Sequence, residues 1–189
     1  MALGLVQPLL RLSPQARQPM QQSKPPATFP TPASWADCPL PQVVDHILDE
    51  YHAPLRRDLA DLEARLGTAL ESPSASQEQG LFVSAAMDSF RPLAHELLEH
   101  LAKEECVLFP WIRTGRGASA GGPIRVMQHE HRLAELYLQR LRHLADATQR
   151  SGSVDDVVAD LMQRLAALDA SLRDHIELEE LMFLRVLAG

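Results

Sequence analysis

The sequence predicts an all-α protein that folds as an up-down-up-down antiparallel four-helix bundle with a Pro-rich N-terminal tail. Apolar residues recur at alternating steps of three and four along four long segments, the pattern of a helix with one buried face. Short stretches rich in glycine, serine or proline separate these segments, and short connections favour antiparallel neighbours. The 189 residues are enough to bury a substantial core in one domain.

The first two predicted helices each contain a proline. The apolar stripe of the first helix comprises Val44, Leu48, Leu55, Leu59, Leu62 and Leu66. The stripe of the second comprises Phe90, Leu93, Leu97, Leu101, Leu108 and Trp111. The first fades at Gly67, and the second ends in the glycine- and serine-rich stretch 113–122. Pro54 and Pro92 lie inside these helices at a cost of roughly 3 kcal/mol each. We therefore expect a kink or a late helix start at both.

The last two predicted helices have clearer starts. Pro123 suits the first position of the third helix, and Ser153 suits the cap of the fourth. The third stripe comprises Ile124, Met127, Ala134, Leu138 and Leu141, and it ends around residues 150–152. The fourth comprises Val154, Val157, Leu161, Leu165, Leu168, Leu172, Phe183 and Val186.

The N-terminal segment differs from the rest in composition. Residues 1–36 contain seven prolines, three basic residues and no acidic one, so we expect residues 1–38 to form a flexible tail and residues 39–189 to form the bundle. The first apolar run has no basic segment before it and contains Pro8. We therefore expect no signal peptide and a cytoplasmic location.

Charge and cysteine content exclude several classes of function. The net charge of −7 offers no basic patch for phosphates, and no run of 18 or more apolar residues could cross a bilayer. We expect neither nucleic acid nor a membrane as partner. Cys38 and Cys106 form neither a disulfide framework nor a CxxC pair.

Six titratable residues occupy positions on the apolar stripes where a buried side chain is expected. They are His52 on the first helix, His100 and Glu104 on the second, His131 on the third, and His175 and Glu179 on the fourth. At 1.5 Å of rise per residue, their distances from the helix ends place all six in one layer, roughly 12 to 18 Å from the same end of an antiparallel bundle. The stripe pattern alone does not require this agreement in height.

Bound metal explains this cluster better than ordinary burial does. A single buried histidine is usually a hydrogen-bonded core residue, and a single buried glutamate usually pairs with an arginine or lysine. No arginine or lysine lies on these stripe positions. Burying such groups without a counter-charge costs several kcal/mol per ion, which a bound cation would offset. A metal-free interaction bundle remains the alternative.

The number and type of the six residues indicate which metal they would bind. Six ligands exceed the need of one tetrahedral zinc, and a mixed imidazole and carboxylate set suits iron or manganese. Glu104 and Glu179, on diagonally opposed helices, could each bridge two ions, leaving two histidines for each ion. The sequence thus predicts a dinuclear centre with an oxo or hydroxo bridge and open positions for a small ligand.

Four segments resemble the metal-bearing helices of hemerythrin-like (HHE cation-binding) proteins. They are VVDHILDEYH at 43–52, LLEHLAKEECVLFPWI at 97–112, GPIRVMQHEH at 122–131 and RDHIELEELMFLRVL at 173–187. Within that family they look most like the di-iron proteins of iron-sulfur cluster repair, over about residues 39–187. The resemblance implies that the ligands of two irons are His52, His100, Glu104, His131, His175 and Glu179, with Glu104 and Glu179 bridging. It also implies that Glu96 and Glu130 flank the centre.

The resemblance implies a function in the response to nitrosative and oxidative stress. The protein would assist repair of damaged iron-sulfur or iron centres, with damaged iron-sulfur proteins and O2, NO or peroxide as partners. The alternative is a module that binds or senses O2 or NO without repair activity. Whether the protein is an enzyme stays open.

The sequence departs from the family pattern in three places. The paired-cysteine motif common in the repair proteins is absent from residues 1–36, and the LFP motif at 108–110 becomes Phe183-Leu184-Arg185 in the fourth helix. Glu135 lies four residues after His131, where oxygen-carrying hemerythrins have a second histidine. It is either a seventh ligand or a residue that faces solvent or bonds a ligand histidine. Asp45 and Asp49 are candidates for bonding the second ring nitrogen of His52, or they are solvated.

Overall fold

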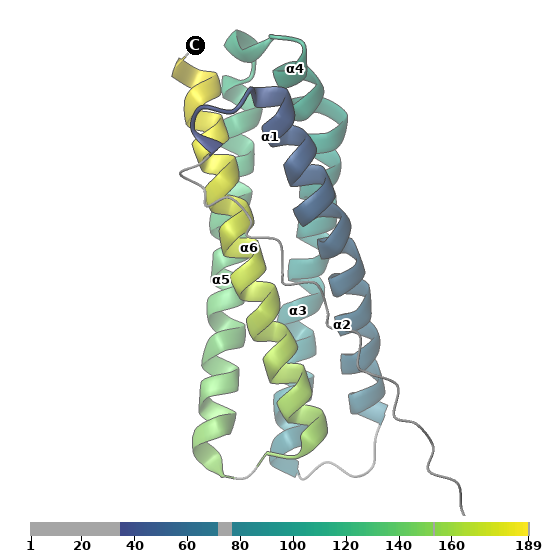
Figure 1. Cartoon of the computed structure of the whole chain (residues 1–189). Coiled ribbons are helices and arrows are strands. Elements are labelled where there is room, and N and C mark those ends of the chain that lie inside the picture. Colours follow the sequence, from purple (N-terminus) through teal and green to yellow (C-terminus); the bar gives the residue numbers. More distant parts are fainter. Residues whose placement is uncertain (1–34, 72–76, 153, 189) are drawn as a thin grey trace, which may run out of the picture.

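Four helical rods pack side by side along their length in the computed structural model, which describes residues 35–71, 77–152 and 154–188 (Figure 1). Every regular element in these ranges is a helix. The first rod packs on the second and fourth, and the third packs on the same two, so the second and fourth are diagonally opposed. The predicted all-α four-helix bundle is confirmed. The predicted tail lies almost entirely outside the described residues.

The first two rods are each interrupted by one wide π-helical turn. The first rod consists of α1 (Leu40–Ile47), the π turn η2 (Leu48–His52) and α2 (Ala53–Glu71). The second consists of α3 (Gln77–Lys103), the π turn η3 (Glu104–Leu108) and α4 (Phe109–Arg113). A short 3-10 turn, η4 (Gly117–Ser119), leads to the third rod.

The third and fourth rods are single α-helices, α5 (Gly121–Ser151) and α6 (Asp156–Ala188). α5 begins two residues before Pro123, which still lies in the first turn, where it needs no donor. Ser153, the predicted cap of the fourth helix, lies outside the described residues. Asp155 caps α6 instead, because its carboxylate accepts a hydrogen bond of 2.8 Å from the backbone N–H of Val158.

The π turns explain how the rods continue past two prolines. The N–H of Ala53 donates to the carbonyl of Leu48, and the N–H of Phe109 donates to that of Glu104, each five residues back. Pro54 and Pro110 follow directly. A proline ring crowds the carbonyl four residues before it, and the wider turn relieves this crowding. Pro92, by contrast, lies inside an uninterrupted α3, so the expected late start there is wrong.

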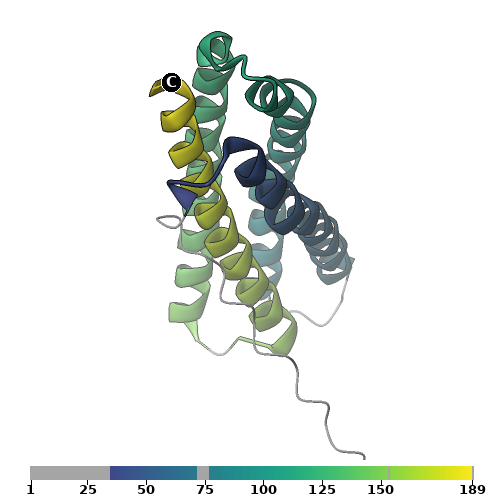
Figure 2. The same cartoon turned by 45° about the horizontal axis from the view of Figure 1, so that its top comes forward.

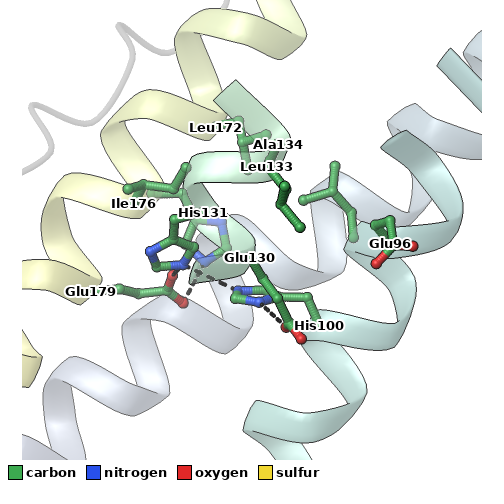
Figure 3. A pocket seen from close by; sticks show the side chains of 11 residues that line it. Glu96, His100, Glu130, His131, Leu133, Ala134, Leu172, Ile176 and Glu179 are labelled. Atoms are coloured by element: carbon green, nitrogen blue, oxygen red, sulfur yellow. Dashed lines mark hydrogen bonds and ion pairs between the residues drawn. The ribbon is translucent and has the colours of Figure 1, made fainter. Parts of the chain in front are cut away.

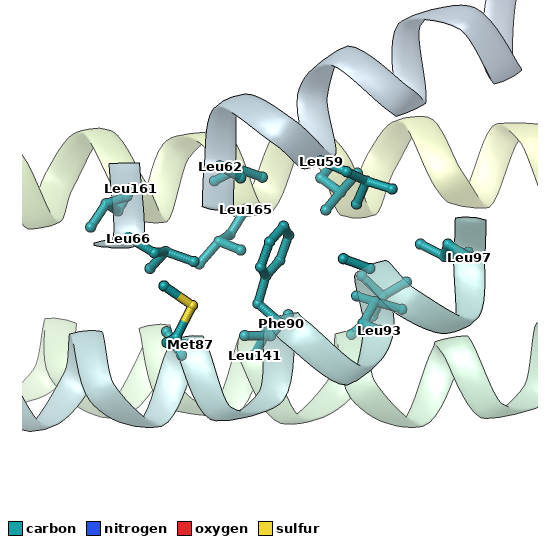
Figure 4. Close-up of a cluster of buried hydrophobic side chains, with 14 of the residues drawn as sticks. Leu59, Leu62, Leu66, Met87, Phe90, Leu93, Leu97, Leu141, Leu161 and Leu165 are labelled. Atoms are coloured by element: carbon teal, nitrogen blue, oxygen red, sulfur yellow. The ribbon is translucent and has the colours of Figure 1, made fainter. Parts of the chain in front are cut away.

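Two apolar clusters fill the bundle, one on each side of the six polar residues. The larger fills the half that contains α2 and most of α3, with Leu59, Leu66, Phe90 and Leu165 in its interior (Figure 4). The smaller lies among α1, α4, the start of α5 and the end of α6. On each rod the polar positions fall between members of the two clusters. The candidate site is therefore enclosed by apolar side chains above and below.

Most stripe positions are buried as expected, with exceptions near the helix ends. Val157 is 56% exposed, and its neighbour Val158 is buried in its place. Trp111 is half-buried while Ile112 enters the core. Among the described helices, none is long and apolar enough to cross a membrane.

Candidate metal centre

The six predicted site residues converge in the interior of the bundle. Each is at most 6% exposed. Their ligand atoms form two overlapping groups, and within each group all atoms lie within 4.8 Å of one another. The first group is His52, Glu104, His175 and Glu179, and the second is His100, Glu104, His131 and Glu179. Glu104 and Glu179 belong to both, so the geometry has two histidines on each side of a shared carboxylate pair.

The local helix geometry brings each residue to this layer. In α6, His175 and Glu179 are four residues apart and so share one face of the helix. The pair His100 and Glu104 has the same spacing, with Glu104 as the first residue of η3. His52 is the last residue of η2. π turns inside α-helices are frequent at functional sites, and both of these turns carry a member of the cluster.

Glu179 faces histidines of both groups with different oxygen atoms. Its Oε1 lies 2.7 Å from Nε2 of His175 and 3.4 Å from Nε2 of His52. Its Oε2 lies 3.1 Å from Nε2 of His131 (Figure 3). One oxygen per group is the arrangement that a carboxylate bridging two cations requires.

Glu104 faces both groups too, but without any hydrogen bond. Its Oε2 lies 3.4 Å from Nε2 of His52 and 3.4 Å from Nε2 of His100. Both oxygens of Glu104 are fully buried without a hydrogen-bond partner, and so is Oε2 of Glu179, whose contact with His131 is not aligned for one. An unsatisfied buried polar atom costs about 1 to 3 kcal/mol, and more when charged.

The Nε2 atoms of two histidines also lie where a cation could bind. Nε2 of His131 and Nε2 of His100 face each other at 3.2 Å. Together with the partnerless carboxylate oxygens, they form a set of inward-facing ligand atoms that a cation could bind in place of protons. The donor set of this structure therefore fits a pair of metal ions.

Carboxylates outside the cluster hold three of the four imidazole rings by their Nδ1 atoms. Nδ1 of His52 donates to Glu105 at 2.8 Å, and Arg56 donates to both oxygens of that carboxylate at 2.8 and 3.1 Å. A hydrogen bond at Nδ1 fixes the ring and leaves Nε2 directed inward.

The second group has the same outer contacts. Nδ1 of His100 donates to Glu130 at 3.0 Å, and Lys103 donates to the other oxygen of Glu130 at 2.6 Å. Nδ1 of His131 donates to Glu180 at 3.1 Å. Glu130 was expected to flank the centre from the family resemblance, and it does.

Sequence reasoning missed Glu105 and Glu180, although the sequence contained a signal. Both HxxxE pairs continue as HxxxEE, at 100–105 and at 175–180. The first glutamate of each doublet enters the cluster, and the second bonds a histidine of a neighbouring rod. Asp45, which was considered for that role at His52, instead pairs with Arg113.

The burial of opposing charges shifts several pKa values. Burial lowers the pKa of His52, but the nearby carboxylates of Glu104 and Glu179 outweigh it and raise the value to about 10. His131 rises likewise to about 9, mainly through Glu179. Burial lowers the pKa of His100 to about 4. Burial and the charge of Glu179 raise the pKa of Glu104 to about 8. Without a cation, the carboxylates therefore hold protons on His52 and His131 but not on His100.

A small pocket of about 10 Å³ adjoins the cluster (Figure 3). It is lined by His100 and His131 of one group, by His175 of the other, and by the shared Glu179. Its apolar wall consists of Leu97, Leu133, Ala134, Leu172 and Ile176. Glu96, exposed at the surface, and Glu130 also line it. A space of this size is at the lower limit of what one water molecule needs.

Glu135 lies outside the cluster. Its carboxylate, 45% exposed, accepts hydrogen bonds from Arg142 at 2.7 Å and from Arg173 at 3.0 Å. The seventh-ligand hypothesis is not supported by this position. Cys106 is exposed, and so are His129 and His143.

Comparison with known proteins places the chain among metal-binding helical bundles. Residues 43–187 match the family described as "Hemerythrin HHE cation binding domain". The chain is similar to the protein named iron-sulfur cluster repair protein YtfE of Escherichia coli O157:H7, with 33% identity over 165 residues that cover 86% of this chain and 73% of the relative. Proteins of the same name from Escherichia coli O139:H28 (strain E24377A / ETEC) and Shigella boydii serotype 18 are 32% identical with the same coverage.

Proposed function

The chain belongs to the hemerythrin HHE cation-binding family, and from this we propose that it is a non-haem di-iron protein that assists repair of damaged iron-sulfur or iron centres. We place it in the cytoplasm, in the response to nitric oxide and oxidants. The observation that carries the proposal is the pair of overlapping histidine and carboxylate groups that share Glu104 and Glu179. The name of the similar proteins supports the repair function.

Each iron would be held by two histidines and one oxygen or more from the shared glutamates. His52 and His175 would hold one ion, and His100 and His131 the other. The partnerless oxygens of Glu104 and Glu179 support this assignment, because bridging would satisfy them. An iron pair with an oxo or hydroxo bridge would supply Lewis acidity and one-electron redox chemistry.

The protein's own residues would orient and protect the ions. Glu105, Glu130 and Glu180 keep three rings turned so that Nε2 faces inward. The two apolar clusters exclude bulk water from both ends of the site. The small pocket beside His100 and His131 would let O2, NO or peroxide approach from one side.

Repair activity can be tested directly. Iron-loaded protein is mixed with an iron-sulfur enzyme that nitric oxide has inactivated, and recovery of that enzyme's activity is followed. We expect recovery above that given by the same concentration of free ferrous iron. The Glu135→Ala variant serves as a control, because its carboxylate is removed outside the cluster. Recovery no better than with free iron would contradict the repair proposal.

The second candidate function is an O2- or NO-binding or sensing module, and the apolar pocket favours it. A space of about 10 Å³ walled by aliphatic side chains has no room for a protein-bound cluster, so only a small molecule would reach the centre from this side. Reversible gas binding, seen in the visible spectrum without recovery of the damaged enzyme, would decide for this function. Recovery of the enzyme would decide for repair.

A further inference from the structure

A continuous series of aromatic rings leads from the surface to the candidate centre. Trp35 stacks on His46 with ring centroids 4.3 Å apart, and His46 meets the edge of Tyr51 at 5.7 Å. Tyr51 stacks on His175 at 5.2 Å. Trp35 and Tyr51 are both partly exposed, whereas His175 is buried in the cluster. Each ring is thus in or near contact with the next, from solvent to a candidate ligand.

Arg185 fixes the outer end of this series. Its guanidinium donates to the backbone carbonyls of Trp35 at 3.0 Å and of Cys38 at 2.6 Å. The segment before α1 is therefore held against the end of α6, as both views show (Figures 1 and 2). Arg185 stands where the corresponding motif of the second rod has Pro110. The departure from the LFP pattern thus supplies the residue that holds Trp35 in place.

Tyr51 directly precedes a candidate ligand histidine, and the residue at the equivalent position in the other half of the centre is a glutamate. Glu130 precedes His131 and bonds Nδ1 of His100. Tyr51 precedes His52 in the same way, but it stacks on His175. A ring that can lose an electron therefore replaces a carboxylate at this place. The chain has only two tyrosines and two tryptophans, and one of each belongs to this series.

We propose that Tyr51 and Trp35 carry electrons to the centre when it meets peroxide, so that the ligand histidines are spared oxidation. This inference rests on the proposed di-iron function. Hydrogen peroxide needs two electrons and two protons to become two water molecules. The phenol of Tyr51 and the indole of Trp35 each give up one electron and one proton, which leaves two neutral radicals. Soluble one-electron reductants such as thiols or ascorbate then restore both rings, each with a proton from solvent.

The surroundings of Tyr51 favour loss of an electron. Asp174, Glu50 and Glu177 act on its ring as negative charges, which stabilise the positive charge that the ring carries between the loss of its electron and the loss of its proton. Because Tyr51 is only half-buried, its proton can pass to water. His46 is not oxidised in this scheme and only bridges the two oxidisable rings.

Four matched variants test the proposal in the full-length, iron-loaded protein. Tyr51→Phe and Trp35→Phe alter the series, and Tyr137→Phe and Trp111→Phe alter the other tyrosine and tryptophan. After iron content has been measured, hydrogen peroxide is added, samples are frozen within milliseconds, and radicals are recorded by electron paramagnetic resonance. We expect a tyrosyl signal that is lost in Tyr51→Phe and kept in Tyr137→Phe. Trp35→Phe should lose the tryptophanyl signal, and Trp111→Phe should keep it.

Oxidation of the ligands gives a second readout. Mass spectrometry of the peptide that contains His175 should find more oxidised histidine in Tyr51→Phe than in Tyr137→Phe after the same exposure. A protein that holds its iron but shows no radical, or shows one that survives in Tyr51→Phe, would overturn the electron path and leave the di-iron function standing. A protein that binds no iron would overturn both.

Discussion

The two halves of the candidate centre have the same inner residues and different surroundings. Each half consists of two histidines and the shared Glu104 and Glu179. Around His100 and His131, both Nδ1 atoms bond carboxylates and an apolar pocket adjoins the rings. Around His52 and His175, one Nδ1 bonds Glu105 and the other ring stacks on Tyr51.

This difference shows that nearly symmetric halves can be adapted separately through their outer contacts. Both histidines of one half, His100 and His131, line the small pocket, whereas only His175 of the other half does. The side of His175 is the one connected to the surface by aromatic rings. The ligand set alone therefore does not predict what each ion would do. That depends on the residues that contact the ligands from outside the cluster.

The largest expected effect comes from removing what the halves share. Glu104→Ala or Glu179→Ala should reduce iron content from about two ions per chain to well below one, because each carboxylate would serve both ions. Elemental analysis of the purified variants measures this, with Glu135→Ala as the control that keeps full loading. A variant that retains one ion would show that the halves bind independently, and the bridging assignment would fail.

Metal removal should lower stability in both halves together. Chelation leaves buried carboxylates and imidazoles facing one another, and binding to the folded state alone stabilises by about 4 kcal/mol at a metal concentration 1,000 times Kd. We expect a lower Tm after chelation and full recovery on adding iron, measured by thermal denaturation. Equal Tm values for both forms would argue that the six residues satisfy one another without metal.

The metal-free form should also lose stability as the pH rises. The pKa of His52 is raised to about 10 and that of His131 to about 9, whereas unfolded histidine titrates near 6.5. A group whose pKa is higher in the folded than in the unfolded protein stabilises the fold fully when the pH is below its unfolded pKa. This stabilisation is lost as the pH rises through its folded pKa. Glu104, raised to about 8, acts in the same direction.

Urea denaturation of the chelated protein at several pH values measures whether its stability falls or rises with pH. The free energy of unfolding should fall between about pH 6.5 and 10. Iron-loaded protein should show a smaller fall, because the ions replace those protons. A rise across this range would contradict the proposed proton-holding cluster.

Substitutions of the glutamates that bond the Nδ1 atoms should affect one half of the candidate centre at a time. Glu105→Gln should lower the affinity for the ion held by His52 by about 10- to 100-fold. Glu130→Gln should lower the affinity for the ion held by His100 by a similar factor. Competition with a coloured chelator measures the two dissociation steps. If both substitutions weakened the same step, the assignment of histidines to separate ions would be wrong.

Glu135→Ala should have the smallest effect. The carboxylate bonds Arg142 and Arg173 at the surface, so its loss should cost at most about 1 kcal/mol of stability. Iron content and azide affinity should stay unchanged, as measured by elemental analysis and by titration of the visible spectrum. A clear rise in azide affinity would restore this residue as a candidate ligand.

The sequence predicted the inner residues better than the outer ones for a physical reason. Spacing along one helix fixes which side chains share a face, so the positions of His175 and Glu179 followed from local geometry. Contacts between rods depend on how each rod is rotated, which the π turns alter in two of them. Asp45 was therefore expected near His52 but pairs with Arg113, and Glu105 holds the ring instead.

Glu135 shows the same limit. Four residues after His131 it shares that histidine's face by spacing, but two arginines from α5 and α6 hold its carboxylate at the surface. At the helix ends, periodicity does not say which of two neighbouring apolar residues enters the core: Val158 is buried instead of Val157, and Ile112 instead of Trp111. The ring series from Trp35 depends on Arg185, which lies 150 residues away in sequence.

The π turn of the second rod has a consequence for how this chain tolerates insertions and deletions. A π turn holds one residue more than an α turn can accommodate, so η3 acts as a stored single-residue insertion. If this turn closed to α geometry without losing a residue, the parts on either side would rotate by about 100° relative to each other. Either Glu104 would then leave the cluster or Phe109 and Ile112 would leave the core. Deleting Val107, whose side chain is exposed, would instead let the rod become a continuous α-helix with both parts still facing inward, so this turn is a place where the chain can lose one residue.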